Sequence, residues 1–321
     1  MSYPLTFEPI FKERIWGGCD LQRLYKKALP TGVRIGESWE ISDRPGDVSV
    51  IANGPLAGRS LRWLMENDPS GLLGDLSPMP TRFPLLIKII DAQEKLSLQV
   101  HPPAAIAAKL GGEPKTEMWY VANAGTSAEL FVGLKPGVTR DEFEQKIASQ
   151  TVSECFHRIP VTAGDSVFIP SGRVHALGAN IMIFEVQQNS DTTYRVFDWN
   201  RVDASGKPRD LHIVQSLASI DFNDFQPGLL PAEFVPDDNG QIRPLVSNDL
   251  FRVSVRKLDD ARSVRFSGGQ MRILGVVEGH LRLRGGNQEI DCFAGQFSLL
   301  PANLREAIVT PVTQVTFLEI S

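Results

Sequence analysis

Cysteine is scarce in this sequence, and the few positions that it occupies exclude two kinds of site. The chain has three cysteines among 321 residues, Cys19, Cys155 and Cys292. An odd number of widely separated cysteines without a CxxC pair predicts neither a disulfide framework nor a cysteine-ligated zinc site. The expected state is three reduced thiols in a cytoplasmic protein.

Long apolar runs and clusters of positive charge are also missing. The apolar run LLIKII is far shorter than the roughly 20 residues that span a bilayer. The N-terminal MSYPLTFEPIF has no basic segment leading into an apolar one, which argues against a secretory signal. The formal net charge is −5, and no basic run is present. These absences predict a soluble protein that binds neither membranes nor nucleic acid.

The composition, 42% hydrophobic and 22% charged, is ordinary for a globular chain long enough for one large domain or two. Most segments predict strands. In KLSLQVH the alternation places Ser97, Gln99 and His101 on one face. FPLLIKIIDA is apolar except for Lys88, which either reaches solvent at a strand edge or has a special role, because burying an unpaired charge is costly. Short helices are expected at residues 56–66, 104–110, 139–149 and 211–219.

The segment GDSVFIPSGRVHALGAN, residues 164–180, carries the most informative motif. A Gly-Asp turn, an apolar run and a Pro-Ser-Gly bend precede His175. This order resembles the second signature of the cupin family, whose small β-barrels place the histidine on a metal. The closing Asn180 lies one residue later than the usual spacing. GQFSLLPANLREA, from Gly295, repeats the pattern with Glu306 in the position of His175.

The repeat and the strand patterns together predict the fold. We expect a mainly β protein of two cupin-type (jelly-roll) β-barrels with a few short helices. Residues 1–235 would form the catalytic, metal-binding domain. Residues 236–321 would form a second barrel that has lost the histidine and its metal.

Four residues of the first predicted barrel are candidate metal ligands. Gln99 and His101 project from one strand, and Glu117 comes from the next strand, in KTEMWYV. His175 completes the set. Two imidazoles, a carboxylate and an amide oxygen suit Zn²⁺ in a site with open positions. Two histidines and a carboxylate also suit non-haem Fe²⁺, so the residue types leave the metal open.

Several segments in a fixed order identify a family. ESWEIS, FPLLIKIID, QVHP, KTEMWYV, PSGRVHALG and EVQQNSDTTYRVFDWNR are similar to the successive motifs of type I mannose-6-phosphate isomerases in their shorter bacterial form. The similarity covers roughly residues 7–220 and, more weakly, the second predicted barrel. It implies interconversion of mannose 6-phosphate and fructose 6-phosphate with one bound zinc. The implied zinc ligands are Gln99, His101, Glu117 and His175.

The resemblance also implies roles for four further residues. Arg195 matches the active-site arginine, and Glu185 matches a carboxylate proposed as the base. Lys88 and Ser97 match positions proposed to hold the phosphate. The reaction needs a base beside the carbon, a cation or dipole facing the oxygens, and an anchor for the remote phosphate. Lys115, beside the predicted metal, is the alternative base.

Two other functions are compatible with these residues. An Fe²⁺ oxygenase could use His101, Glu117 and His175, but Gln99 then occupies a position that such an enzyme would leave open or fill with histidine. A non-catalytic sugar-phosphate-binding protein could keep the pocket, but it would have no need of a proton-transfer group such as Glu185. The expected partner is a small sugar phosphate, and the chain is predicted to be a monomer or a homodimer.

Overall fold

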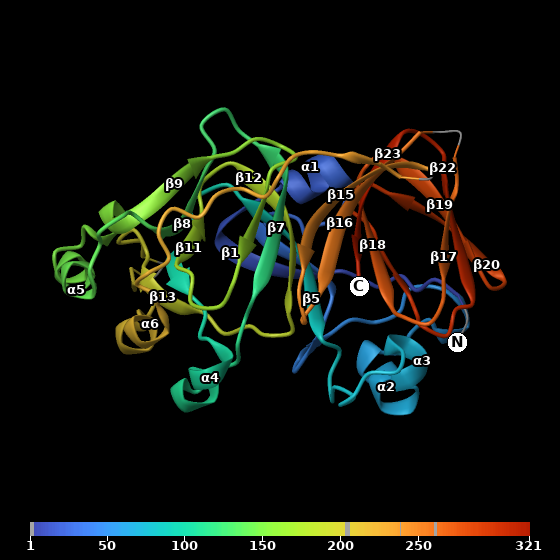
Figure 1. Ribbon diagram of the computed structural model, residues 1–321, viewed down its shortest axis with the longest axis horizontal. Helices are drawn as coiled ribbons and strands as arrows, with labels where there is room; N and C mark the ends of the chain where they lie inside the picture. The colour runs from blue at the N-terminus through green and yellow to red at the C-terminus, as the bar shows by residue number, and fades with distance from the viewer. Residues whose placement is uncertain (1–2, 203–205, 238, 260–261) are drawn as a thin grey trace.

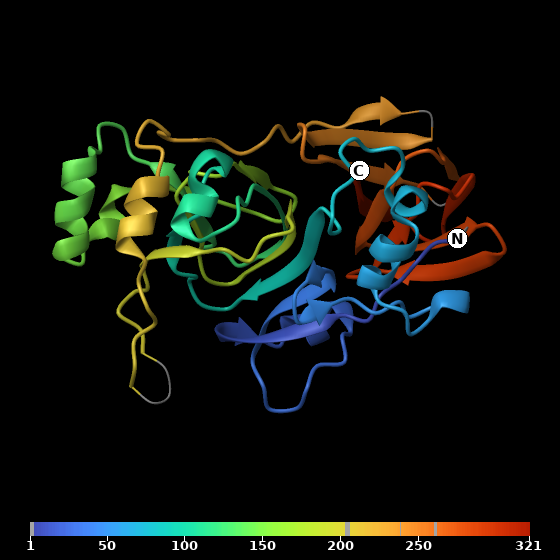
Figure 2. The same ribbon diagram turned by 90° about the horizontal axis from the view of Figure 1, so that it is seen from below.

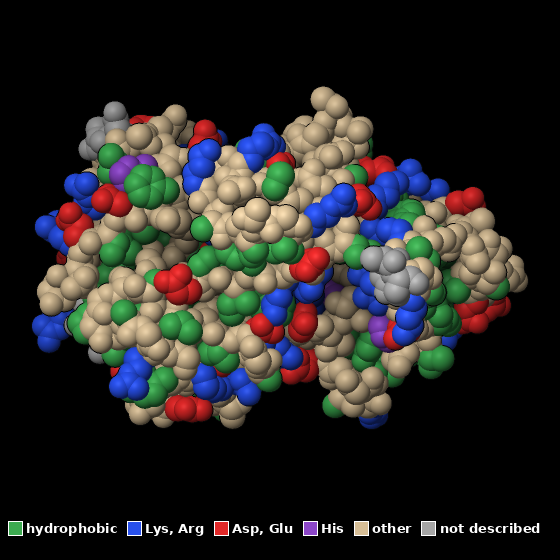
Figure 3. Space-filling model, turned by 180° about the vertical axis from the view of Figure 1, so that it is seen from behind, with side chains coloured by type: hydrophobic (Ala, Val, Ile, Leu, Met, Phe, Trp, Pro, Cys, Tyr) green, Lys and Arg blue, Asp and Glu red, His purple; other side chains and the backbone are tan. Residues whose placement is uncertain are grey.

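The computed structural model describes residues 3–202, 206–237, 239–259 and 262–321. Its described chain consists mainly of β-strands, as predicted. Figure 1 shows the strands in two groups side by side, with the green and yellow strands in one group and the orange and red strands in the other. Positive and negative side chains are interspersed over the face shown in Figure 3, which shows no broad area of one sign.

The first group of strands forms two antiparallel sheets. The first sheet has the order β1 (Ile10–Gly18), β2 (Ile35–Ile41), β5 (Leu85–Ala92), β12 (Ile181–Gln188), β7 (Glu117–Ala124) and β10 (Ser166–Ile169). The second sheet has the order β13 (Tyr194–Phe197), β6 (Leu98–Val100), β11 (His175–Leu177), β8 (Glu129–Leu134) and β9 (Phe156–Pro160). A small hairpin consists of β3 (Asp43–Arg44) and β4 (Asp47–Val48).

The second group repeats this strand order. One sheet has the order β14 (Val235–Asp237), β15 (Gly240–Ser247), β16 (Arg252–Leu258), β23 (Val315–Ile320), β18 (Arg272–Glu278) and β21 (Phe297–Leu300). The other has the order β17 (Val264–Ser267), β22 (Glu306–Pro311), β19 (His280–Gly285) and β20 (Gln288–Phe293).

The sequence repeat corresponds to this structural repeat. β10 begins two residues after Gly164, and β21 begins two residues after Gly295. β11 begins at His175 and β22 begins at Glu306, the two aligned positions. The exposed Glu306 pairs with Arg265, at 2.6 Å. The sheets are not closed barrels, so the mainly β class is confirmed and the jelly-roll barrel detail stays a prediction.

The helices are short, as expected. They are α1 (Asp20–Tyr25), α2 (Leu61–Asn67), α3 (Pro69–Leu73), α4 (Ala104–Ala107), α5 (Arg140–Ala148) and α6 (Ile213–Ser219), with 3₁₀ turns η1 (Gly54–Leu56), η2 (Ala108–Leu110) and η3 (Val152–Cys155). The expected helix start at residue 56 is wrong, because Ser60 caps α2 by accepting a hydrogen bond from the Trp63 amide. The helix expected at residues 139–149 is confirmed as α5, and Thr139 caps its start by accepting a hydrogen bond from the Glu142 amide. Among the described residues, no helix has the length and apolar character to cross a membrane.

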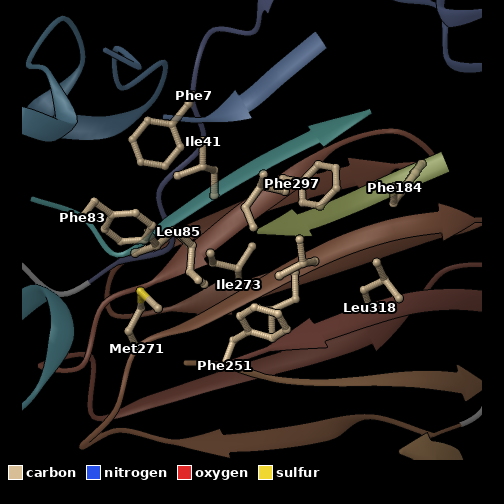
Figure 4. Close-up of a cluster of buried hydrophobic side chains, with 14 of the residues drawn as sticks. Phe7, Ile41, Phe83, Leu85, Phe184, Phe251, Met271, Ile273, Phe297 and Leu318 are labelled. Carbon is tan, nitrogen blue, oxygen red and sulfur yellow. The ribbon is translucent and has the colours of Figure 1, made fainter. Parts of the chain in front are cut away.

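A continuous hydrophobic cluster joins the two groups of strands. Figure 4 shows Phe184 of β12 beside Phe297 of β21, and their ring centroids are 5.3 Å apart. At the N-terminus, Leu5 pairs through its backbone with Leu299, and α2 and α3 lie against the second group in Figure 2. The part of the chain before β5 therefore packs on both groups of strands. Through the shared hydrophobic cluster, the second group also buries one face of the first.

Replacing Phe184 by alanine is expected to lower the free energy of unfolding by about 3–5 kcal/mol, because the fully buried ring leaves a cavity between the two groups of strands. Chemical denaturation followed by circular dichroism measures this loss. Val214→Ala is the control, since Val214 is 77% exposed and its truncation should change stability by less than about 0.5 kcal/mol. Equal losses for the two variants would contradict a shared core at Phe184.

Candidate active site

Four neighbouring strands of the first sheet bring a row of large polar and aromatic side chains to one place. The register sets Trp39 of β2 opposite Lys88 of β5, and Lys88 opposite Glu185 of β12. Glu185 in turn lies opposite Trp119 of β7. Residues directly opposite in antiparallel strands have their side chains on the same face. Lys88 thus lies on a central strand with its side chain buried, so the alternative of an amine at the strand edge is wrong.

The second sheet contributes a matching row. Arg195 of β13 lies opposite Gln99 of β6, which lies opposite His175 of β11. The Pro-Ser-Gly bend fixes the approach of His175, because Gly172 has a φ of +93°, a conformation that side chains disfavour. The Gly172 amide also donates a hydrogen bond to the carbonyl of His101, at 2.8 Å. The bend is therefore anchored to the end of β6.

The two sheets bring three predicted ligands together. His101, Glu117 and His175 are fully buried, and each offers a donor atom within 4.8 Å of the others. Glu117 Oε1 lies 3.2 Å from His101 Nε2, and Glu117 Oε2 lies 3.7 Å from His175 Nε2. Gln99 Nε2 lies 3.3 Å from His175 Nε2. Although Glu117 is on the next strand along the chain, it belongs to the other sheet.

The unsatisfied polar atoms of this cluster fit a metal ion. Within the described chain, both ring nitrogens of His101 and both carboxylate oxygens of Glu117 lack a hydrogen bond. Leaving such atoms without a hydrogen bond in a protein interior is costly, although Glu117 Oε1 has the ammonium of Lys115 at 2.8 Å. Ligands about 2.05 Å from a tetrahedral zinc lie about 3.4 Å apart, which is close to the separations among these donors.

The tautomer of His175 also suits a metal. Its Nδ1 lies 2.9 Å from the carbonyl of Arg173, which can only accept, so Nδ1 donates and Nε2 keeps its lone pair. A 180° flip of the Gln99 side-chain amide exchanges its nitrogen and oxygen, so that the oxygen faces the other proposed ligands. All four predicted ligands can therefore offer a donor atom to one ion.

The electrostatics of the cluster hold its members in metal-binding protonation states. Burial and the charge of Lys115 lower the pKa of His101 to about 3, and burial also lowers the pKa of His175. Burial opposes ionisation of Glu117, but Lys115 and His101 outweigh it and hold the Glu117 pKa well below its usual value. Neutral imidazoles beside an ionised carboxylate are the ligand forms that bind a divalent metal.

The carboxylate of Glu185 is held from two sides. Its Oε1 accepts a hydrogen bond from the indole of Trp119 at 2.9 Å, and its Oε2 lies 3.1 Å from Lys88 Nζ. Among the described residues, Oε2 has no hydrogen bond of good geometry. Burial and the nearby negative charge of Glu117 raise the pKa of Glu185. The carboxylate is therefore oriented, and one of its oxygens is available for proton transfer.

Lys88 is surrounded by carboxylates. Its ammonium lies between Glu185 and Glu37, whose Oε2 is 4.0 Å away. Burial lowers the pKa of Lys88, but these two carboxylates outweigh it, so the pKa is raised overall. Glu37 also accepts hydrogen bonds from Trp39 and Arg14. The charge of Lys88 is thus already balanced within the protein.

A cavity of about 460 Å³ opens beside these groups, which is a typical size for a small-molecule site. The predicted residues that line it are Lys88, Ser97, Gln99, Lys115, Glu185 and Arg195. The three clustered ligands lie behind this wall, fully buried next to Gln99. The structure therefore brings all nine predicted site residues to one location.

Sequence reasoning missed other residues that line the cavity, namely Glu13, Arg14, Glu37, Asp191, Thr193 and Arg209. For Glu37 a signal was present, because GESWEIS places Glu37 and Trp39 on the same face of β2 as neighbours of Lys88. Arg209 has no such signal, since it lies in an irregular segment between β13 and α6.

Comparison with known proteins adds independent findings. The model of the family described as phosphomannose isomerase type I, catalytic domain, matches residues 5–136. The probable mannose-6-phosphate isomerase of Bacillus subtilis is 37% identical over 310 residues, which cover 95% of this chain and 96% of that protein.

Two solved structures of mannose 6-phosphate isomerases have the same fold as this chain. The crystal structure of the mannose 6-phosphate isomerase from Bacillus subtilis matches with a TM-score of 0.90 and 29% identity, covering 100% of both chains. A mannose 6-phosphate isomerase solved with bound zinc shares the fold at a TM-score of 0.79 and 17% identity, covering 98% of both chains.

Proposed function

The chain belongs to the type I phosphomannose isomerase family, and from this premise we propose that it interconverts D-mannose 6-phosphate and D-fructose 6-phosphate through an enediolate. The observation that carries the proposal is the position of Glu185. Its carboxylate is oriented by Trp119 and Lys88 on the wall of a cavity, and the His101, Glu117 and His175 cluster lies behind that wall. An aldose–ketose isomerase needs such an oriented base next to a group that polarises the sugar oxygens.

We propose that one Zn²⁺ per chain is held by Gln99, His101, Glu117 and His175. The support is the set of unpaired buried donors, their separations, and the tautomer of His175. Bound zinc supplies a Lewis acid that polarises a carbonyl or hydroxyl of the sugar. The arginine carbonyl that orients His175 acts as its outer partner and fixes the ring.

Glu185 is the proposed base. Its Oε2 would take the proton from C2 of the open-chain aldose and return it to C1, while the hydroxyl proton on the C2 oxygen moves to the C1 oxygen and Oε1 stays bound to the Trp119 indole. Burial raises the pKa of Glu185, which makes the carboxylate a stronger base. Lys115 also lines the cavity, 2.8 Å from Glu117 Oε1, and it is the alternative base.

The remaining predicted residues are proposed to hold the substrate. Ser97 and Arg195 line the cavity and would contact the phosphate. The sequence assigned Lys88 to the phosphate as well. A phosphate at Lys88 would bring a dianion close to Glu185 and Glu37, so we propose that Lys88 instead positions Glu185.

Proton NMR of mannose 6-phosphate with the purified protein in D₂O tests the function. We expect no conversion after chelation and the appearance of fructose 6-phosphate when Zn²⁺ is restored, because the sugar oxygens need polarisation in the transition state. Mannose 6-phosphate with Zn²⁺ and no protein is the control. Absence of conversion in both protein samples would leave another metal enzyme or a binding protein as the function.

Three finer predictions accompany this function. We propose a cytoplasmic location, supported by the three free cysteines. We propose residues 1–235 and 236–321 as the two domains, supported by the repeated strand order. We propose that the chain acts as a monomer or a homodimer, which analytical ultracentrifugation would decide.

A further inference from the structure

The cations that line the cavity fall into two groups. Lys88 and Lys115 are about 95% buried and lie within 3.1 Å of a carboxylate oxygen. Arg14 is likewise paired with Glu37, at 2.8 Å. Arg195 and Arg209 also line the cavity. Among the described residues, Arg195 makes no ion pair, and Arg209 shares the carboxylate of Asp198 with Arg201. These two arginines are therefore the cations of the cavity whose charge is least balanced by the protein.

The guanidinium of Arg195 has a donor that can still bind a ligand. Its Nη1 donates to the carbonyl of Asp210, at 2.7 Å, so its guanidinium is tied to the residue that follows Arg209. Its buried Nε has no hydrogen bond within the described chain. Burial and the charge of Arg209 both lower the pKa of Arg195. Two guanidinium groups that repel each other beside a cavity are stabilised when an anion binds between them.

Among the residues that the structure describes, Arg209 is held in place by one edge of its guanidinium. Its Nε and Nη2 donate to the two carboxylate oxygens of Asp198, at 2.7 and 2.5 Å. A guanidinium has five N–H donors, so this pairing leaves the Nη1 side for another acceptor. Asp198 also accepts from Arg201, so the carboxylate is shared between two arginines and does not neutralise both.

The irregular segment that carries Arg209 is hydrogen-bonded to the cavity wall near its start. Arg201 donates to the carbonyl of Lys95 at 2.6 Å, and the Trp199 indole donates to the carbonyl of Leu96 at 2.7 Å. Both acceptors directly precede Ser97. Arg209 is therefore presented to the cavity by an anchored segment. Another carboxylate of the wall, Asp191, raises the pKa of Arg14 and of Lys88.

We propose that Arg209 is a specificity-determining residue that, together with Arg195, binds the phosphate of the substrate in the cavity. This inference rests on the proposed function. It assigns the phosphate to the two arginines and Ser97, and it leaves Lys88 to the carboxylates that surround it. Discrimination between a phosphorylated and an unphosphorylated hexose would then depend on a segment that is distant in sequence from the proposed metal ligands.

Kinetics and direct binding of inorganic phosphate test the proposal in Arg209→Gln and Arg209→Lys. We expect Arg209→Gln to raise KM for mannose 6-phosphate and the Kd for inorganic phosphate, measured by calorimetry, about 10- to 100-fold, the usual effect of losing a hydrogen bond to a charged group. The value of kcat should stay within about threefold, and Arg209→Lys should be intermediate. Zinc content and melting temperature report on folding.

Arg265→Gln is the control. It removes a largely exposed arginine of the second group of strands, which pairs with Glu306 and does not line the cavity, and it should change the phosphate Kd less than about threefold. A wild-type phosphate Kd in Arg209→Gln, with or without a loss of turnover, would overturn the inference. Absence of isomerisation by the wild-type protein would instead contradict the proposed function, and the phosphate titrations would still decide whether Arg209 binds phosphate.

Discussion

Replacing His175 by alanine is expected to remove the bound zinc and to lower kcat by more than about 1,000-fold. The imidazole is fully buried, its Nδ1 is committed to the carbonyl of Arg173, and its Nε2 lies 3.7 Å from Glu117 Oε2 in the cluster of proposed ligands. Loss of a direct ligand costs more than loss of an outer partner, which alone costs about 10- to 100-fold. Metal analysis of the dialysed protein and the isomerase assay measure the two effects.

The control for this experiment is His280→Ala, which removes a histidine of the second group of strands, where it pairs with Asp291. That variant should keep its zinc and its turnover. His101→Ala should behave like His175→Ala, because both imidazoles approach the carboxylate of Glu117. A His175→Ala protein that folds, lacks zinc and still isomerises mannose 6-phosphate would refute the metal-dependent mechanism.

Glu185→Gln is expected to lower kcat by about 100- to 10,000-fold, the usual contribution of a positioned general base, with KM nearly unchanged. Glutamine keeps the shape and can still accept from Trp119, but its amide cannot remove a proton. Exchange of the C2 proton of mannose 6-phosphate with D₂O, followed by NMR, should be lost in parallel. Zinc content should not change, since Glu185 is not among the clustered ligands.

Two further variants separate the candidate roles near Glu185. In Lys88→Met the carboxylate loses its buried cation but keeps its hydrogen bond from Trp119, so a fall in kcat smaller than that of Glu185→Gln is expected. Lys115→Met tests the alternative base. If Lys115→Met stops proton exchange while Glu185→Gln retains it, the base is Lys115.

The side chains around Lys88 are linked, so a single substitution among them is expected to change several interactions at once. Lys88 lies between Glu185 and Glu37, and Glu37 also accepts from Trp39 and Arg14. Removing one partner from a buried ion pair leaves an uncompensated charge and can destabilise a protein by about 3–5 kcal/mol. Melting temperatures therefore accompany every kinetic comparison, so that lost function is distinguished from lost folding.

Most residues of the candidate site could be named from the sequence because they belong to periodic strands and to one turn motif. The alternation in KLSLQVH placed Gln99 on the face with Ser97, and the glycine and proline of the bend predicted the approach of His175. The structure agrees that Glu117 joins them. By contrast, Glu37, the second carboxylate beside Lys88, was missed, because strand pairing between β2 and β5 joins segments about fifty residues apart.

The sequence by itself determined the class of fold, the repeat and the residue types of the metal cluster, since each depends on local spacing. Tertiary structure alone decided that β5 is central, so that Lys88 is buried among carboxylates. It also decided that an irregular segment places Arg209 beside Arg195 at the cavity. The physical reason is the same in both cases: pairing between sheets and packing of loops depend on contacts distant in sequence, which period and spacing do not encode.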